Sequence, residues 1–229
     1  ESAVIVIPVR MASTRFPNKP LAQIKGKTMI ERVWHIAQAV PFASKVLIAT
    51  DSEELKAFAE KFGADVMMTS PDCVTGTDRV AEVSRHLDQE HTIFFSFQGD
   101  AVLTPPWVIE AVLQSMLSDP SIQIATPAVL LKDKARVDFI ANKRGGSSSG
   151  TAVTFDKSGR ALYFSKALIP YHREEMHPDR TIYRHIGLYG YRAKILQKLS
   201  LFPEGPFERS EKLEQLRALE NGIPIQVVQ

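Results

Sequence analysis

An uninterrupted apolar run fills residues 3–9 with the sequence Ala3-Val4-Ile5-Val6-Ile7-Pro8-Val9, and Arg10 follows it directly. Runs of this kind are typical of strands that are buried on both faces, as in a parallel sheet. Residues 29–40 then place apolar side chains at helical spacing, and residues 45–50 form the next apolar run. This alternation predicts an α/β fold with a mostly parallel sheet.

The same alternation continues toward the middle of the chain. A helix after residue 50 is predicted to begin at Asp51 or Ser52, whose side-chain oxygens can cap it, and to end at Gly63. The pattern further predicts strands over residues 64–68 and 92–97 and within 122–131, and helices over residues 78–87 and 106–117.

The pattern changes in the second half of the chain. Residues 151–155 and 161–165 flank Asp156-Lys157-Ser158-Gly159, which is typical of a hairpin turn. Residues 145–150, all glycine or serine, favour a flexible loop. The last elements predicted are a strand over residues 186–191, a helix over 210–220 and a strand over 225–228. We therefore expect a smaller antiparallel region within a single domain that spans residues 1–229.

Composition excludes several classes of protein. Of the 229 residues, 44% are hydrophobic and 24% are charged, which is typical of a globular chain and not of a disordered or collagen-like one. A single cysteine excludes a disulfide framework, so we expect a cytoplasmic protein. No apolar stretch approaches the ~20 residues of a membrane span. A net charge of +2 does not favour a nucleic-acid partner.

The loop after the first strand is rich in positive charge. Residues 2–30 contain no acidic side chain and five basic ones: Arg10, Arg15, Lys19, Lys25 and Lys27. In an open α/β sheet, ligands bind beyond the carboxyl ends of the strands, where this loop is expected. Arginine and lysine bind phosphate there, so the loop favours a polyanion such as a triphosphate. A solvated basic surface is the alternative that charge alone leaves open.

Two common nucleotide-binding motifs are missing. Gly26-Lys27-Thr28 matches the end of a phosphate-binding P-loop, but Leu21 occupies the position that requires the first glycine. No Gly-x-Gly-x-x-Gly follows a predicted strand, which argues against a dinucleotide site.

Two other segments are candidates for a nucleotide site. Gln98-Gly99-Asp100 follows a buried strand, and Mg²⁺ bound to phosphates typically uses one or two protein carboxylates, so Asp100 is a candidate ligand. A role in the turn is the alternative for Asp100. Residues 75–79, Thr75-Gly76-Thr77-Asp78-Arg79, offer amides and hydroxyls to a base or ribose, although Thr77 or Asp78 would equally serve as a helix cap.

The other reactive side chains carry weaker signals. Cys73 has no basic partner imposed by the sequence, so we do not expect a nucleophile there. The six histidines lack metal-ligand spacing such as His-Glu-x-x-His.

Taken in order, these motifs resemble one known family, the CMP-KDO synthetases, or 3-deoxy-manno-octulosonate cytidylyltransferases. The resemblance begins with Pro8-Val9-Arg10 through Pro20 and ends with Leu213-Glu214-Gln215-Leu216-Arg217. Between them lie matching segments at residues 26–30, 49–51, 68–72, 75–79, 98–100, 161–165 and 184–187. Several motifs in the correct order are far more specific than any one of them.

The resemblance implies a bacterial cytoplasmic enzyme that joins CTP to an eight-carbon 3-deoxy sugar acid, releases pyrophosphate and supplies a donor for lipopolysaccharide. It implies a Rossmann-like nucleotidyltransferase sheet and a homodimer. Residues 132–192 would approximately form a subdomain for dimerisation and sugar binding.

The family's site residues carry over to matching positions of this chain. The nucleotide would be bound by Arg10, Ser13, Arg15, Lys19, Thr77 and Arg79. Catalysis would depend on Arg15, Lys19 and Asp100, with Asp100 also binding Mg²⁺. The sugar acid would contact Gln98, Tyr163, Ser165, Arg184, His185, Glu208, Glu211 and Gln215.

Three departures from the family pattern keep alternatives open. Ala101-Val102 stands where the family has Glu-Pro, and a second metal-binding Asp of the family would follow Gln229. The segment 143–150 and the run Ile169-Pro170-Tyr171-His172-Arg173 are also unusual, which suggests an altered sugar such as the 8-amino analogue. The alternatives are a CMP-sialate synthetase, another sugar nucleotidyltransferase, or a nucleotide-binding protein that has lost catalysis.

Overall fold

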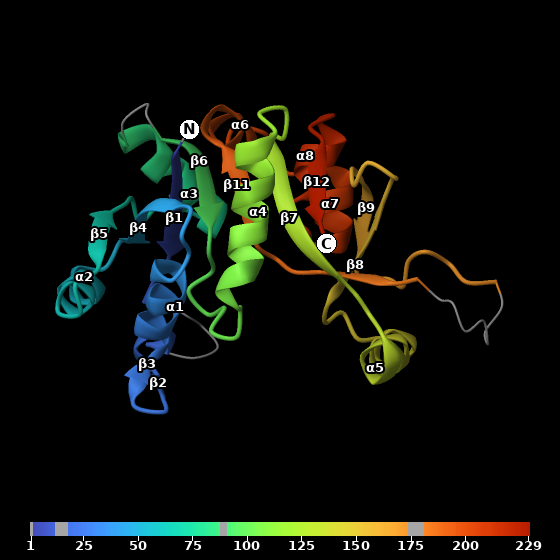
Figure 1. Ribbon diagram of the computed structural model, residues 1–229, viewed down its shortest axis with the longest axis horizontal. Coiled ribbons are helices and arrows are strands. Elements are labelled where there is room, and N and C mark those ends of the chain that lie inside the picture. The colour runs from blue at the N-terminus through green and yellow to red at the C-terminus, as the bar shows by residue number, and fades with distance from the viewer. Residues whose placement is uncertain (1, 12–17, 88–90, 174–180) are drawn as a thin grey trace. The chain divides into compact units, whose positions relative to one another are not determined.

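The computed structural model describes residues 2–11, 18–87, 91–173 and 181–229 (Figure 1). The chain forms two compact units, which we describe separately. Unit 1 comprises Glu1–Ser121 and Leu188–Leu201, and unit 2 comprises Ile122–Gly187 and Phe202–Gln229.

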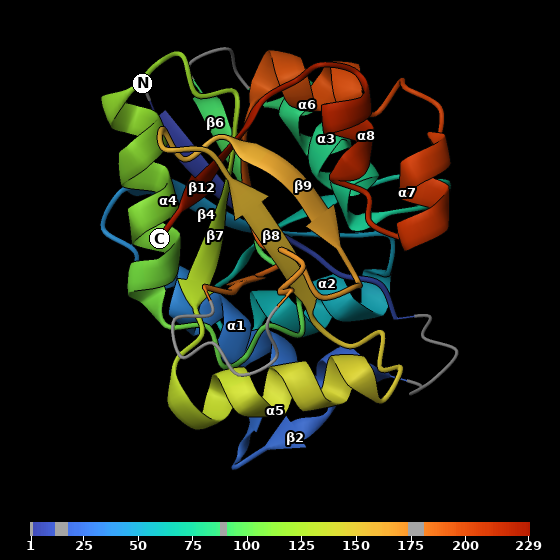
Figure 2. The same cartoon turned by 90° about the vertical axis from the view of Figure 1, so that its right-hand side faces the viewer.

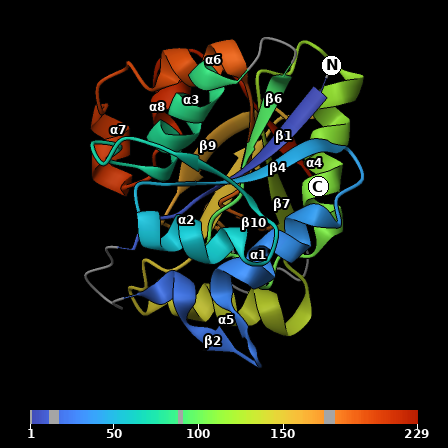
Figure 3. The same cartoon turned by 90° about the vertical axis from the view of Figure 1, so that its left-hand side faces the viewer.

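Unit 1 contains the predicted parallel strands (Figure 3). In spatial order they are β5 (Asp65–Met68), β4 (Ala43–Thr50), β1 (Ser2–Pro8) and β6 (His91–Ser96), all parallel, followed by β11 (Tyr189–Arg192), which is antiparallel to β6. Residues 3–7 of β1 are completely buried, as their apolar run predicts. The α/β fold with a mostly parallel sheet is confirmed.

The predicted helices of unit 1 follow the strands in the expected order. They are α1 (Met29–Gln38), α2 (Glu53–Glu60), α3 (Gly76–His86) and α4 (Pro106–Ser118). Helix α6 (Ala193–Leu199) was not predicted. Ser52 caps α2 by accepting from the Leu55 amide, and Gly63 has a positive φ of 86° just after the helix. A 3-10 turn (Lys19–Leu21) and the short pair β2 (Gln23–Ile24) and β3 (Lys27–Thr28) precede α1.

Unit 2 is mainly antiparallel, as the second half of the sequence predicts (Figure 2). Its strand order is β12 (Ile225–Val228), β7 (Ile124–Leu130), β10 (Tyr183–His185), β8 (Thr151–Phe155) and β9 (Ala161–Ser165). β12 is parallel to β7, and the other neighbours are antiparallel. The β8–β9 hairpin is confirmed, because Asp156 Oδ1 accepts from the amides of Ser158 and Arg160 in the turn.

Two predicted elements are wrong. The strand expected over residues 186–191 begins only at Tyr189, because the chain bends at Gly187, and β10 ends at His185 before the expected range. The helix expected over 210–220 is divided into α7 (Pro206–Glu211) and α8 (Leu216–Glu220). Lys212 adopts the left-handed conformation, with φ 54°, and ends α7.

Helix α5 (Asp133–Arg144) has no counterpart in the prediction. Only Phe139 is buried in it, so the sequence carries almost no apolar stripe of the kind that marks a helix. Within the described residues, no helix has the length and apolar character needed to span a membrane.

Candidate active site

The predicted nucleotide segments of unit 1 meet where β1 and β6 end. A side-chain carbon added at Gly99 would lie 2.8 Å from Cγ2 of Val9, so only glycine fits there without movement. A carbon at Gly76, the first residue of α3, would lie 3.4 Å from Cγ of Pro8 and 3.6 Å from Oε1 of Gln98. The start of α3 thus lies against the ends of both strands, as expected for ligand sites in α/β sheets.

Lys19 and Asp100 form the central polar contact of this edge. Lys19 Nζ donates to Asp100 Oδ2 at 2.5 Å, and the two side chains are 39% and 54% exposed. Asn18 adopts the left-handed conformation before the 3-10 turn, and Pro20 within the turn is buried. The turn therefore holds Lys19 beside the carboxylate that the sequence nominates as a metal ligand.

Arg10 is exposed and lies near the same loop. Its Nη2 donates to the carbonyl oxygen of Val74 at 3.0 Å, just before the first turn of α3. Arg10, Lys19 and Asp100 therefore belong to one edge of unit 1, as predicted. Ser13 and Arg15, the other predicted phosphate ligands, lie outside the described residues.

Arg79 is engaged inside the protein. It is only 3% exposed, donates from Nη1 to Thr69 Oγ1, and pairs through Nη2 with Asp51 Oδ2 at 3.0 Å. Arg79 therefore ties α3 to the residues that follow β4 and β5. Thr77, the other predicted contact to the cytidine, is buried as well. The sequence predicted Asp51 only as a possible helix cap and assigned no role to Thr69, although both lie in the segments that resemble the family.

The cap of α3 differs from the prediction that Thr77 or Asp78 serves as N-cap. Thr75 accepts from the Asp78 amide at 3.0 Å, and the Asp78 carboxylate accepts from the Thr75 amide at 2.9 Å. This reciprocal pair is a capping box, and it starts the helix two residues earlier than predicted.

The sugar candidates other than Gln98 lie in unit 2, and several share one face of its sheet. Ser165 and Arg184 are both paired with Ala152, so their side chains point to the same side. Tyr163, two residues before Ser165, lies on that face too. Glu211 accepts from Ser165 Oγ at 2.7 Å and from the Lys166 amide at 2.8 Å. Burial and then the Glu211 carboxylate raise the pKa of Tyr163.

His185 lies on the opposite face of these strands. It is paired with Thr151, its ring lies 4.9 Å from that of Phe164, and its Nε2 is 2.8 Å from Thr126 Oγ1. Burial and then the charge of Lys166 lower the pKa of His185 to about 3. His185 is therefore neutral at physiological pH and separate from the Tyr163, Ser165 and Arg184 group.

Glu208 and Gln215 are both buried but differ in their contacts. Both carboxylate oxygens of Glu208 accept from Arg217, at 2.8 Å from Nε and 2.6 Å from Nη2. Gln215 is 7% exposed, and its Nε2 finds no hydrogen-bond partner among the described residues. Glu208 therefore stabilises the local fold, whereas the Nε2 group of Gln215 is available to donate a hydrogen bond.

The described residues suit a metal only in part. They contain no group of three or more His, Cys, Asp or Glu side chains arranged around one point. Asp100 is a single, half-exposed carboxylate, which fits a cation that takes most of its ligands from phosphate oxygens and water, as Mg²⁺ does.

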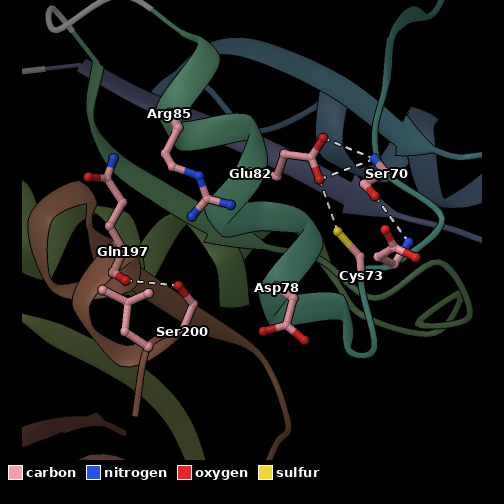
Figure 4. Close-up of a pocket in the computed structure, with 9 residues that line it drawn as sticks. Ser70, Cys73, Asp78, Glu82, Arg85, Gln197 and Ser200 are labelled. Atoms are coloured by element: carbon pink, nitrogen blue, oxygen red, sulfur yellow. Dashed lines mark hydrogen bonds between the residues drawn. The ribbon is translucent and has the colours of Figure 1, made fainter.

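A cavity of about 580 Å³ lies beside α3 and α6 in unit 1 (Figure 4). Within it, the Cys73 thiol donates to Glu82 Oε2 at 3.0 Å, and Glu82 also accepts from the Ser70 amide. Burial and the neighbouring Glu82 raise the pKa of Cys73 to about 11. The thiol stays protonated at neutral pH, which agrees with the expectation that Cys73 is not a nucleophile.

Comparisons with known proteins show the family to which the chain belongs. The family model described as Cytidylyltransferase matches residues 4–225. A 3-deoxy-manno-octulosonate cytidylyltransferase of Maricaulis maris is 49% identical over 99% of this chain and 87% of its own length. The enzyme of the same name from Syntrophotalea carbinolica is 41% identical over 100% of this chain and 90% of its own.

Solved structures extend the comparison. The structure of CMP:2-keto-3-deoxy-manno-octonic acid synthetase complexed with CTP has a TM-score of 0.90 and 36% identity, over 99% of this chain and 89% of the other. A 4-diphosphocytidyl-2C-methyl-D-erythritol synthase, at 11% identity and a TM-score of 0.61 over 100% and 88% of the two chains, shares the fold alone.

Proposed function

Since this chain belongs to the cytidylyltransferase family, we propose that it joins CTP to 3-deoxy-manno-octulosonate and releases pyrophosphate. The observation that carries the proposal is the meeting of Lys19, Asp100 and the start of α3 at the ends of β1 and β6. The solved relative that contains CTP, at 36% identity over nearly the whole chain, supports the choice of nucleotide. The product is an activated sugar for lipopolysaccharide synthesis in the cytoplasm.

The bond changes define what the protein must do. The anomeric hydroxyl of the sugar acid attacks the α-phosphorus of CTP and loses its proton to solvent water. The bond from that phosphorus to the oxygen that bridges to the β-phosphorus breaks, and pyrophosphate leaves with the electron pair. Negative charge grows on the phosphate oxygens, so cationic groups held in place lower the barrier by positioning and electrostatics. Arg10, Arg15 and Lys19, with Ser13 as a neutral donor, would hold the triphosphate.

Asp100 would hold Mg²⁺ together with the phosphates, and the ion when bound would offset charge on them and lower the pKa of the attacking hydroxyl. Lys19 donates to Asp100 Oδ2, so the two side chains that would bind the phosphates and the ion lie side by side.

Unit 2 would provide the sugar site. Tyr163, Ser165 and Arg184 share a face, Glu211 is bonded to Ser165, and the buried amide of Gln215 retains an unused donor. These donors suit the hydroxyls and carboxylate of a sugar acid. Glu208 and His185 would act indirectly, since both are buried in contacts of their own.

The protein would assemble as a homodimer through a subdomain that includes residues 132–192. Leu162 on β9, an outer strand of unit 2, is 63% exposed and is therefore accessible to substitution. Sedimentation equilibrium measures dimer formation directly, and Leu162→Arg should weaken the dimer.

Pyrophosphate release with CTP, Mg²⁺ and the sugar acid tests the function. Lys19→Ala and Asp100→Ala should each lower turnover at least a hundredfold without changing the unfolding curve, while Lys25→Gln, an exposed lysine nearby, should retain activity. Wild-type turnover in either of the first two variants contradicts the mechanism. Tight CTP binding without turnover would favour a protein that has lost catalysis, which Ala101 beside Asp100 would explain.

A further inference from the structure

Three basic side chains of unit 2 surround the start of β8. Lys143, in the last turn of α5, donates from Nζ to the carbonyl oxygen of Gly150 at 2.8 Å. Lys166, just after β9, donates from Nζ to Thr151 Oγ1 at 3.2 Å. A side-chain carbon at Gly150 would lie 3.7 Å from Nε of Arg184, so this guanidinium passes the same backbone. We call Lys143, Lys166 and Arg184 the cationic cluster.

The fold holds Lys143 in this position. Phe139, one turn earlier in α5, is buried in the core of unit 2 with Leu131, Ala152 and Ile182. The Lys143 ammonium lies 5.2 Å from the centre of the Phe139 ring, within the range of a cation–π contact. Lys143 is therefore not a freely moving surface side chain.

The positive charge of the cluster is only partly offset. Burial lowers the pKa of Lys143, and the charges of Lys166 and Arg184 lower it further, while Glu211 acts in the opposite direction. Among the described residues that act on this group, three cations face one carboxylate, which leaves an excess of two positive charges.

The cluster overlaps the proposed sugar site. Arg184 belongs to both, Lys166 follows Ser165 directly, and the Lys166 amide donates to Glu211. Charges act over about 8 Å at physiological ionic strength, farther than a hydrogen bond reaches. A charged group on an eight-carbon acid that binds within this distance of the cluster would therefore interact with it.

We propose that Lys143 is a specificity-determining residue, which completes a cationic cluster that selects an anionic sugar acid over a zwitterionic amino-sugar acid. This inference rests on the proposed function and specifies its substrate class. A carboxylate is attracted by the cluster, whereas an added ammonium group is repelled and loses much of that attraction. The enzyme accordingly uses 3-deoxy-manno-octulosonate in preference to its 8-amino analogue.

The test compares kcat/KM for the two sugars, measured by pyrophosphate release with saturating CTP. The wild-type protein should prefer the anionic sugar, and Lys143→Met should reduce that preference roughly fivefold to tenfold, about the effect of one partly screened charge. Lys143→Arg should keep the preference. Lys134→Met, an exposed lysine at the other end of α5, should leave it unchanged.

A second variant and a salt series test the proposal even if Lys143→Met fails to fold. Lys166→Met alters a different element and should also reduce the preference, and 0.5 M salt should reduce it in the wild type. An equal or greater use of the amino sugar by the wild type, or an unchanged ratio in both methionine variants, overturns the inference while leaving the cytidylyltransferase activity standing. Failure of the wild type to use either sugar contradicts the proposed function itself.

Discussion

Lys19 is the residue whose contact with Asp100 bears most directly on the proposed reaction. Its ammonium nitrogen lies 2.5 Å from Asp100 Oδ2, so a cation that binds this carboxylate competes with the lysine. Lys19→Met should therefore weaken CTP binding and yet strengthen Mn²⁺ binding in the absence of nucleotide. A pair this exposed is worth about 1 kcal/mol, which corresponds to roughly a fivefold gain in Mn²⁺ affinity.

Electron paramagnetic resonance of free Mn²⁺ measures this affinity without any turnover. Lys25→Gln removes a nearby charge that does not contact Asp100, and it should change Mn²⁺ affinity much less. Equal affinities in wild type and Lys19→Met would show that the lysine does not compete for Asp100.

At the scale of elements, the close approach of β1 and β6 at their ends positions Asp100. Gly99→Ala would place a methyl group against Val9, and overpacking of this kind costs about 1–3 kcal/mol. We expect a lower unfolding free energy in urea and a large loss of turnover, because Asp100 is the next residue. Gly187→Ala, whose added carbon meets nothing within 4 Å, should be nearly neutral for stability.

A double variant identifies the cause. Val9→Ala removes the methyl group that Gly99→Ala would strike, so the combined variant should be more stable than the sum of the single effects predicts. Additive losses would mean that the contact with Val9 is not the source of the destabilisation.

Strands and helices with strong apolar periodicity were predictable from the sequence, and those without it were not. The run at residues 3–9 and the hairpin around Asp156 were found because local patterning and burial agree there. α5 was missed because Phe139 alone is buried in it, and the break at Lys212 was missed because nothing in its residue type signals a left-handed conformation.

The site shows the same division. The placement of Lys19 and Asp100 at one sheet edge was predictable, because both lie in segments that follow strands, where α/β sheets bind ligands. The ion pairs of Arg79 with Asp51 and of Glu208 with Arg217 were not predictable, because pairing between distant residues leaves no periodic signal in the sequence. The placement of His185 on the opposite face from Ser165 depends on strand register, which only the structure supplies.

At the scale of the whole molecule, His185 couples stability to pH. Its pKa is about 3 in the folded protein against an ordinary value of 6.5, so the unfolded chain binds the proton more readily. Its contribution to stability is therefore complete above pH 6.5 and is lost as the pH falls toward 3. The slope for this single group is at most about 1.4 kcal/mol per pH unit.

Urea unfolding at several pH values between 4 and 7 checks this expectation. His185→Phe should be less stable at neutral pH, because Thr126 loses a partner, but its unfolding free energy should depend less on pH. The same pH dependence in both proteins would mean that other groups control acid unfolding.

The most direct test of the cytidylyltransferase assignment follows the phosphorus atoms of CTP into the products. The protein is incubated with Mg²⁺, 3-deoxy-manno-octulosonate and CTP that carries ³²P at either the α or the γ position. If the protein is a cytidylyltransferase, α-label appears in the CMP-sugar and γ-label appears only in pyrophosphate. Transfer of γ-label to the sugar, or unchanged CTP in the presence of bound sugar, would contradict it.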